Sequence, residues 1–481
     1  MRKRLALGLC LVAMGTATAN AQQLLSLDSC RAMALRNNKQ MNVQQLKQDV
    51  AENLRKSART KYLPHVAAIG SYQYTSREVS LLNDDQKSTF PKLGTAAGQK
   101  MEQLVPGASS APAIATLLGV LDATGQHIVD AFESDTRNMF AGSVMLTQPV
   151  FMGGSIVALN KMARINQTMA ENTQEATRQL TLYETDRTYW LVVSLKHKQR
   201  LAESYLEVVK KLDADVQKMI EEGVATRSDG LSVSVKVSEA EMSLQKVNNG
   251  LTLAKMLLCQ QIGLPSDSQI TLVDESSESL AETVPAVGVE DAQAHSAAMA
   301  NRPELKLLEN AVDLSRQSTN LLKAGNLPQV LLTGGYIVSN PNLLNGFEKK
   351  FGGMWNVGVT VRVPIWNWGD VCYKVRAAKG TTAIANLELE EAREKIELQV
   401  NQSNFKVEEA NKRQAMADAS IKRAEENLRT AEIGFREGVI TPTTVMEAQT
   451  AWLQAKSQKI DADIDVKMVQ VDLQKAMGNL R

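Results

Sequence analysis

The chain has 481 residues, of which 44% are hydrophobic, 22% charged and only 4% aromatic. The apolar fraction excludes a disordered protein, and 12 prolines are too few for a collagen-like or proline-rich chain. Lys and Arg number 54 against 53 Asp and Glu, so no basic excess is present to drive nucleic-acid binding by counterion release. Four scattered cysteines exclude a disulfide framework and a thiolate zinc site.

Residues 1–21 have the organisation of a secretory signal peptide. A basic start at residues 2–4 precedes an apolar stretch over 5–14, and Ala19-Asn20-Ala21 matches the small-x-small cleavage rule. The alternative is a buried amphipathic helix. Beyond residue 21 the sequence has no run of about 18 apolar residues. An exported chain of this kind is expected to cross a membrane only as a β-barrel.

The chain repeats itself. At an offset of 264, Leu63-Pro64 matches Leu327-Pro328 and Gly70 matches Gly334. At an offset of 215, the matching pairs are Pro149 with Pro364, Gly223 with Gly438, and Gly263 with Gly478. The offsets differ by 49, which places one insertion between residues 75 and 141. We therefore expect a first repeat over 22–264, a linker or equatorial region over 265–290, and a second repeat over 291–481.

Each repeat is expected to contain a helix, two strands, a long helix and a final helix. The first helices are predicted over about 28–62 and 292–324, and the final ones over 227–262 and 443–478. The long helices are predicted over 155–222 and 370–437, each about 100 Å long at 1.5 Å per residue. Apolar residues such as Val400, Val407 and Ile421 recur with a seven-residue period, which predicts supercoiled helices. Taken alone, this period also agrees with a plain coiled coil.

Four strands are predicted, over about 66–74, 142–149, 330–338 and 356–364. Val357, Val359 and Val361 alternate with polar residues, among them Arg362, which we expect to face a lumen. About nine residues suffice to cross a bilayer at a tilt, and aromatic residues near the strand ends are typical of a membrane interface. A small soluble sheet is the alternative. Because four strands cannot close a barrel, the barrel would be shared, and three chains would leave a lumen.

The sequence resembles the TolC family of outer-membrane efflux channels over essentially its whole mature length. The turns Gly223-Val-Ala-Thr and Gly438-Val-Ile-Thr, with the segment Gly438-Val-Ile-Thr-Pro-Thr-Thr-Val-Met-Glu-Ala-Gln, carry this resemblance. The family fold is mostly α with membrane β: a trimer whose twelve-stranded shared β-barrel, four strands per chain, continues into a long α-helical coiled-coil tunnel across the periplasm. The resemblance implies a passive conduit for small molecules or proteins. The implied partners are a homotrimer, a periplasmic adaptor (membrane fusion) protein, an inner-membrane pump and outer-membrane lipid.

The resemblance also implies functional positions at the closed tunnel end. By position, an acidic ring would use Thr444 and Glu447, although Thr444 departs from the usual aspartate. Phe435 would help to hold the end shut, and Asp229 is the corresponding acid of the first turn. The turn residues are Gly223, Thr226, Gly438 and Thr441. A ring of Glu447 residues would favour cations, whereas a solvated helix face is the alternative.

The sequence contains no recognisable catalytic constellation. Its four histidines are isolated and lack metal-ligand spacing, so we expect no enzyme activity, no metal and no cofactor. A periplasmic coiled-coil scaffold or adaptor without a pore is the second hypothesis for the function. Cys30 and Cys259 are expected to approach each other, either as a disulfide or as two buried thiols. The insertion over 75–141 is expected on the cell exterior, as a plug of the lumen or as a surface elaboration.

Overall fold

In a computed structural model of the whole chain, residues 23–76, 82–132, 137–276, 291–342, 345 and 348–480 are described. The predicted signal peptide and most of the predicted linker lie outside these residues. The chain divides into two compact units, each formed by both repeats. We call them the helical unit, formed by described residues of 1–53, 164–315 and 380–481, and the sheet unit, formed by those of 54–163 and 316–379.

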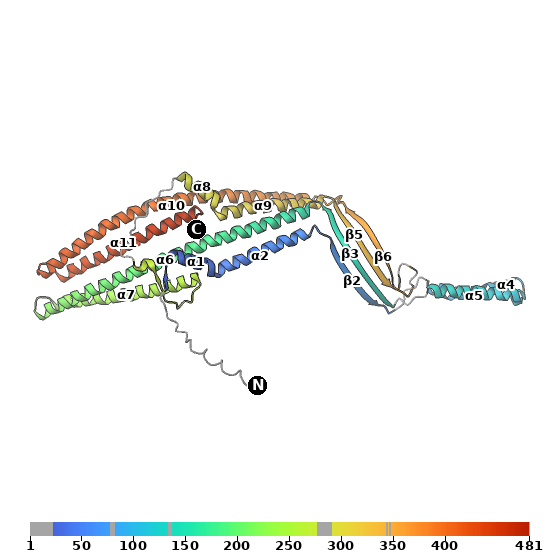
Figure 1. Cartoon of the computed structure of the whole chain (residues 1–481). Coiled ribbons are helices and arrows are strands. Elements are labelled where there is room, and N and C mark those ends of the chain that lie inside the picture. Colours follow the sequence, from blue (N-terminus) through green and yellow to red (C-terminus); the bar gives the residue numbers. More distant parts are fainter. Residues whose placement is uncertain are drawn as a thin grey trace, which may run out of the picture. The chain divides into compact units, whose positions relative to one another are not determined.

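Two long antiparallel hairpins dominate the helical unit (Figure 1). In the first, α6 (Ser155–Glu221) is followed by α7 (Arg227–Ile262), and in the second, α10 (Asp370–Arg436) is followed by α11 (Pro442–Ala476). Both long helices have 67 residues. Val400, Val407 and Ile421 are buried, as their seven-residue period requires if that stripe faces neighbouring helices.

The first helix of each repeat is divided in two, which corrects the single helices expected over about 28–62 and 292–324. The first repeat has α1 (Leu27–Asn37) and α2 (Lys39–Thr60), and the second has α8 (Asp291–Asn301) and α9 (Pro303–Lys323). The second break has a local cause, because Pro303 disfavours helical geometry at Arg302. In the first repeat Asn38 is extended, and its side chain accepts a hydrogen bond from the backbone N–H of Gln40 at 2.8 Å.

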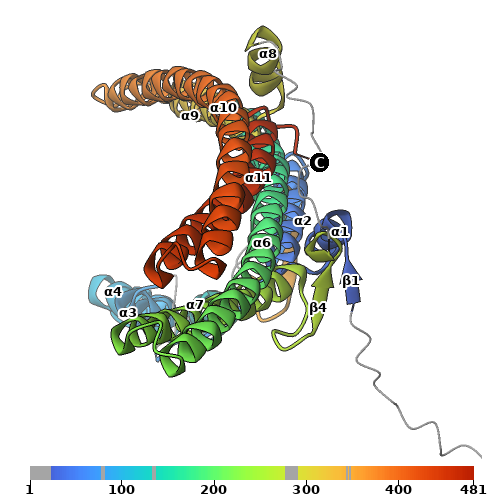
Figure 2. The same ribbon diagram turned by 90° about the vertical axis from the view of Figure 1, so that its left-hand side faces the viewer.

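A short parallel strand pair lies beside α1 and was not expected from the sequence. Residues Gln23–Leu25 form β1 and Ile270–Leu272 form β4, with Leu25 opposite Leu272 (Figure 2). Both leucines are buried in an apolar cluster that also contains Cys30, Tyr189 and Ile262. This pair therefore attaches the start of the described chain to the end of the first hairpin.

The sheet unit contains one antiparallel four-stranded sheet in the order β2-β3-β5-β6. Its strands are β2 (His65–Tyr74), β3 (Asn138–Met152), β5 (Gln329–Asn340) and β6 (Gly352–Arg362). β3 has 15 residues and extends beyond the expected 142–149 at both ends. Its register with β5 shifts between Pro149 and Phe151, so Val150 is the extra residue of a bulge directly after a proline, which has no N–H to donate. The strand expected over 356–364 ends at Arg362, before Pro364.

The insertion between β2 and β3 is helical. It contains α3 (Asp84–Thr89), α4 (Leu93–Leu104) and α5 (Pro112–Phe132). Gly94 and Gly98 allow α4 to approach Leu118 of α5, because a Cβ at Gly94 would lie 1.9 Å from the Leu118 carbonyl oxygen. Asp122 accepts a hydrogen bond from the Thr95 hydroxyl at 2.6 Å, which fixes the two helices together. Between β5 and β6 only residues 341–351 intervene, and the described ones among them form no helix.

Candidate functional site

Two turns close the two hairpins, and we call these turns with their adjoining helix ends the tip (residues 212–233 and 428–449). Gly223 and Gly438 have φ values of +80° and +74°, the left-handed conformation that glycine adopts without strain. The N–H of Val224 donates to the Met219 carbonyl and that of Val439 to the Gly434 carbonyl, both at 2.8 Å. Both turns thus satisfy the last helix carbonyls with the same Schellman arrangement.

The residues that start the two returning helices differ in chemistry. Thr226 caps α7, and its hydroxyl accepts from the Asp229 N–H at 3.2 Å while the Asp229 carboxylate accepts from the Thr226 N–H at 3.0 Å. This reciprocal capping box lowers the pKa of Asp229 through hydrogen bonds from Thr226. Thr441 caps α11, where the corresponding partner Thr444 contacts it only through its N–H at 3.4 Å and its hydroxyl at 3.1 Å.

Phe435 is one of the large residues in the apolar core of the tip. Its exposed fraction is 9%, and its cluster combines residues of both hairpins. The buried members are Leu212, Val216, Val233, Ala431, Phe435, Val445, Met446 and Ala448. The expected tip aromatic is therefore a buried member of a core to which both hairpins contribute.

Glu447 lies on the exposed face of α11, one turn after Thr444, which is also exposed. Among the described residues, none forms a hydrogen bond or ion pair with the Glu447 carboxylate. Asp229 is held by Thr226 on α7, so the structure does not join it to Glu447. An exposed carboxylate without a partner can attract cations from solution.

The two faces of the sheet carry different side chains. The pairing register places Arg362 opposite Gln329, and the face that they share is mixed. It carries the polar residues Thr360, Asn356, Thr333, Ser143 and Ser71 together with the apolar Ile69, Met145, Leu331, Ile337 and Met354. The other face is apolar and is formed by Val66, Ala68, Tyr72, Phe140, Val144, Leu146, Leu332, Tyr336, Val338, Trp355, Val357, Val359 and Val361. Trp355 is 76% exposed and Val357 69%. An apolar surface of this extent favours an apolar environment, since burial of each large side chain stabilises by about 1.5–3 kcal/mol.

Aromatic pairs occupy both ends of this sheet. At the end nearest the insertion, the Tyr72 ring lies 4.8 Å from that of Phe140, and the Tyr72 hydroxyl donates to the Asn138 side chain at 2.9 Å. Beyond the other end, after β6, the rings of Trp366 and Trp368 are 5.8 Å apart and both are highly exposed. Rings with an apolar body and a polar atom are typical of the boundary between lipid and water.

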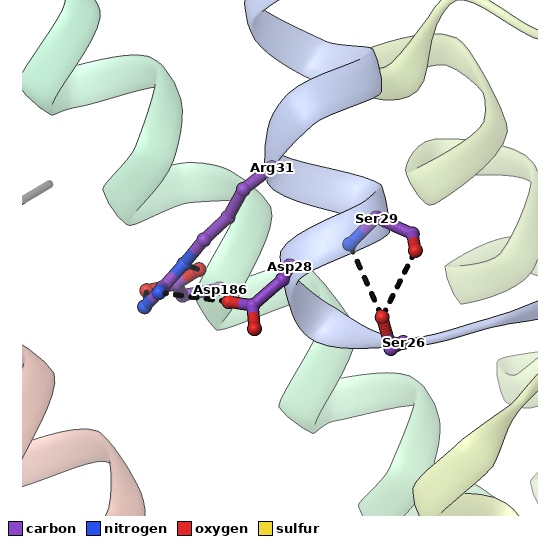
Figure 3. A network of polar contacts seen from close by, with 5 residues as sticks. All are labelled: Ser26, Asp28, Ser29, Arg31 and Asp186. Carbon is purple, nitrogen blue, oxygen red and sulfur yellow. Dashed lines mark hydrogen bonds and ion pairs between the residues drawn. The ribbon is translucent and has the colours of Figure 1, made fainter.

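A buried ion pair anchors the first helix, and sequence analysis did not identify it. Arg31 of α1 donates from Nε and Nη2 to the two carboxylate oxygens of Asp186 on α6, at 2.7 and 2.6 Å (Figure 3). Asp186 is fully buried, and Asp28 lies 3.5 Å from Arg31, while Ser26 caps the helix through the Ser29 N–H. The bonds to Asp186 raise the pKa of Arg31. The sequence does contain a signal for this ion pair, because Asp186 is an acidic residue on the apolar seam of α6, among Leu182, Tyr189 and Val192.

The second repeat has a neutral version of the same contact. At the repeat offsets Arg31 corresponds to His295 and Asp186 to Asn401. The His295 Nε2 lies 2.9 Å from the Asn401 side-chain oxygen, at an exposed position. The position of the contact is thus shared, whereas its charge occurs only in the first repeat.

Cys30 and Cys259 are both fully buried in one cluster and both are free thiols. Burial raises the pKa of Cys30 to about 12, and the neighbouring Cys259 and Asp186 contribute in the same direction. A thiol with so high a pKa is almost entirely protonated near neutral pH and therefore reacts slowly. The structure thus agrees with the second of the two alternatives, a pair of buried thiols.

Two further observations concern the described part of the chain. None of its helices has the length and apolarity needed to cross a membrane. It also contains no group of three or more His, Cys, Asp or Glu side chains that could hold a metal ion.

Comparison with known proteins identifies relatives along most of the chain. The family described as outer membrane efflux protein matches residues 31–264 and 294–479. Outer membrane protein TolC of Vibrio cholerae is 22% identical over 440 residues, which cover 86% of this chain and 94% of that protein.

Solved structures show the same fold. The outer-membrane channel OprN has a TM-score of 0.73 at 16% identity, covering 94% of this chain and 90% of that one. The outer membrane protein VceC of Vibrio cholerae has a TM-score of 0.72 at 14% identity, covering 94% and 96%. The fold of long helical hairpins and a small sheet is therefore the TolC-like fold, and the chain belongs to the outer membrane efflux protein family.

Proposed function

We propose that this chain is the outer-membrane channel of a tripartite export system and acts as a homotrimer. The observation that carries the proposal is the four-stranded sheet, which has one apolar face, one face that mixes polar and apolar residues, and two edges, β2 and β6, that no other described strand pairs. Pairing of β2 with β6 of a neighbouring copy would satisfy both edges. Three copies supply twelve strands, enough to enclose a lumen lined by the mixed face, which carries Arg362.

In this proposal the apolar face contacts outer-membrane lipid and the tip is the gate. Phe435 holds the two hairpins together, and three copies of Glu447 provide a ring of negative charge at the narrowest point. The capped turns at Thr226 and Thr441 form the surface at which a periplasmic adaptor and an inner-membrane pump act. The channel is passive, and small molecules or proteins move through it because the pump supplies the energy.

The oligomeric state and the pore can be tested on purified protein. We expect the chain to partition into membranes, to require detergent for extraction and to have the mass of three chains in native mass spectrometry. Trimers opened at the tip by Phe435→Ala should conduct ions across a planar bilayer. A water-soluble protein that gives no current would instead support the second hypothesis, a periplasmic scaffold without a pore.

The acidic ring has its own test. Glu447→Ala is expected to reduce the preference of the open channel for cations, because it removes three charges that converge on one axis. Glu447→Asp keeps the charge and serves as the matched control, so its selectivity should stay close to that of the wild type. Unchanged ion selectivity in Glu447→Ala would rule out the proposed acidic ring, but it would not contradict the proposed channel.

A further inference from the structure

A cleft of about 500 Å³ in the helical unit carries an excess of positive charge. It lies where the α8–α9 junction meets α10, α11 and α6. Its charged lining residues are Arg302, Lys395, Lys406 and Lys475, opposed by Glu304 and Asp472. We call it the second-repeat cleft.

Arg302 is the unusual member of this lining. Its exposed fraction is only 9%, yet among the described residues no carboxylate lies within ion-pairing distance of it. Its Nε donates to the Ala476 carbonyl at 2.7 Å and its Nη1 to the Gln399 side-chain oxygen at 2.8 Å. Both acceptors are neutral, and burial lowers the pKa of Arg302, although the more distant Glu304 carboxylate acts in the opposite direction. A buried charge whose direct hydrogen-bond acceptors are all neutral is costly, and a counter-anion in contact with it would offset that cost.

The lysines extend the positive region. Lys395 is paired with Glu391 at 2.5 Å, whereas Lys406 and Lys475 form no ion pair among the described residues. The Lys475 ammonium lies 3.6 Å from the centroid of the Tyr183 ring. Asp472 interacts with the hydroxyl of Tyr183, whose pKa it raises together with burial. Arg302, Lys406 and Lys475 thus line one cleft without a direct ion pair among the described residues, and the Lys475 ammonium keeps N–H donors besides its contact with the Tyr183 ring.

The first repeat contains the equivalent cleft without these charges. This first-repeat cleft, of about 780 Å³, is lined by Asn38, Leu180 and Gln260 among others. At the repeat offsets these three residues correspond to Arg302, Lys395 and Lys475. Gly263 and Gly478, with φ values of +77° and +70°, lie against the corresponding loops at Asn37 and Arg302. The same backbone arrangement thus carries a cationic lining in one repeat and a largely neutral one in the other.

We propose that the second-repeat cleft binds a small anion with a carboxylate or phosphate group, with Arg302 as the buried anchor and Lys406 and Lys475 as supporting charges. A guanidinium binds such groups through two parallel N–H donors, and the ammonium groups add attraction without fixing geometry. The cleft volume admits inorganic phosphate or a small organic acid. The inference goes beyond channel function, because the site needs no flow through the protein.

The experiment is titration calorimetry on the full-length trimer in a neutral detergent, in chloride buffer. The probes are inorganic phosphate, citrate and short-chain phosphatidic acid, which separate free phosphate, carboxylate and lipid-borne phosphate. We expect saturable binding of at least one probe to the wild-type protein. Arg302→Gln should abolish it, and Lys406→Gln should weaken it about fivefold, because Lys406 is exposed and contributes a single charge contact.

Lys39→Gln in the first-repeat cleft is the matched control and should bind as the wild type does. Lys406 lies on the surface, so its variant keeps the test valid even if Arg302→Gln fails to fold. The absence of saturable binding to the wild-type protein would overturn the proposed site. That result is expected if a carboxylate of a neighbouring copy fills the cleft. Undiminished binding by both variants would also overturn it. Planar-bilayer conductance of the same samples reports separately on the channel.

Discussion

The two repeats have kept their backbone features and changed their polar contacts. Gly223 and Gly438 close the hairpins with the same left-handed turn, and both long helices have 67 residues. In contrast, a buried Arg31–Asp186 pair stands where the second repeat has an exposed His295–Asn401 hydrogen bond. Apolar seams and turns are constrained by packing along the whole hairpin, whereas one polar contact can be replaced if its partner changes with it.

The largest expected effect comes from breaking the charged contact of the first repeat. Asp186→Asn leaves the mostly buried Arg31 with only the exposed carboxylate of Asp28, 3.5 Å away, as a counter-charge, and we expect a loss of about 3 kcal/mol of stability. Asn401→Ala in the second repeat removes one exposed hydrogen bond and should cost about 1 kcal/mol or less. Thermal unfolding followed by circular dichroism, with hydrogen exchange across α1, compares the two. Equal losses of stability in the two variants would show that the charge of the Arg31–Asp186 pair adds no stability beyond that of a neutral hydrogen bond.

The tip cores of the two long helices should also respond unequally. Phe435→Ala removes a ring from the shared cluster. Because the cluster lies at the hairpin ends, where the chain can relax around the lost ring, we expect a loss of about 2 kcal/mol, below the roughly 3–5 kcal/mol of a central core position, together with more frequent channel opening. Ile220 is the corresponding residue of the first repeat and is only partly buried, so Ile220→Ala should have a smaller effect. Single-channel open probability measures both variants. More opening in Ile220→Ala than in Phe435→Ala would assign the closure to the first hairpin.

The turns are expected to differ in their response to acid. Thr226 lowers the pKa of Asp229, so the folded first turn favours the ionised carboxylate. Its stabilisation is present above the ordinary carboxyl pKa and is lost as the pH falls through the lowered value. Hydrogen exchange at the start of α7, corrected for intrinsic rates, should increase below about pH 4 and match that of Asp229→Asn. The start of α11, where Thr444 does not titrate, should show no such change.

The smallest expected effect comes from making the second turn resemble the first. Thr444→Asp supplies the carboxylate that completes a capping box with Thr441, and we expect α11 to gain about 0.5 kcal/mol. Thr443→Asp places the same charge one residue earlier and separates capping from attraction to the helix dipole. Slower hydrogen exchange in the first turn of α11 for Thr444→Asp alone is the expected result. Equally slow hydrogen exchange in both variants would show that attraction to the helix dipole alone accounts for the effect.

Much of this fold could be predicted from the sequence because its signals are periodic. The seam through Val400, Val407 and Ile421 indicates the long helices, and the glycines at 223 and 438 mark their ends. The alternation from Asn356 to Arg362 predicts both faces of β6, as the register with β5 confirms. Such patterns extend over many residues and therefore depend little on any one contact.

The missed features depend on single residues or distant partners. Pro303 ends a helix that the apolar pattern alone would continue, and the first repeat breaks at Asn38 without a proline. The β1–β4 pair joins two three-residue strands that are separated in the sequence by residues 26–269. Each strand is too short to show alternation. Nothing local links Arg31 to Asp186. The tip positions Thr444, Glu447 and Asp229 came from a resemblance, and their roles in gating stay predictions.

The unpaired edges of the sheet have a genetic consequence. Suppose that each β2 pairs with a neighbour's β6. A chain with intact helices and a proline within β2 would then still assemble, but it would prevent closure of the barrel in every trimer that contains it. With equal synthesis of both forms, only about one trimer in eight would consist entirely of wild-type chains. Such an allele would be dominant, whereas deletion of the whole gene would be recessive.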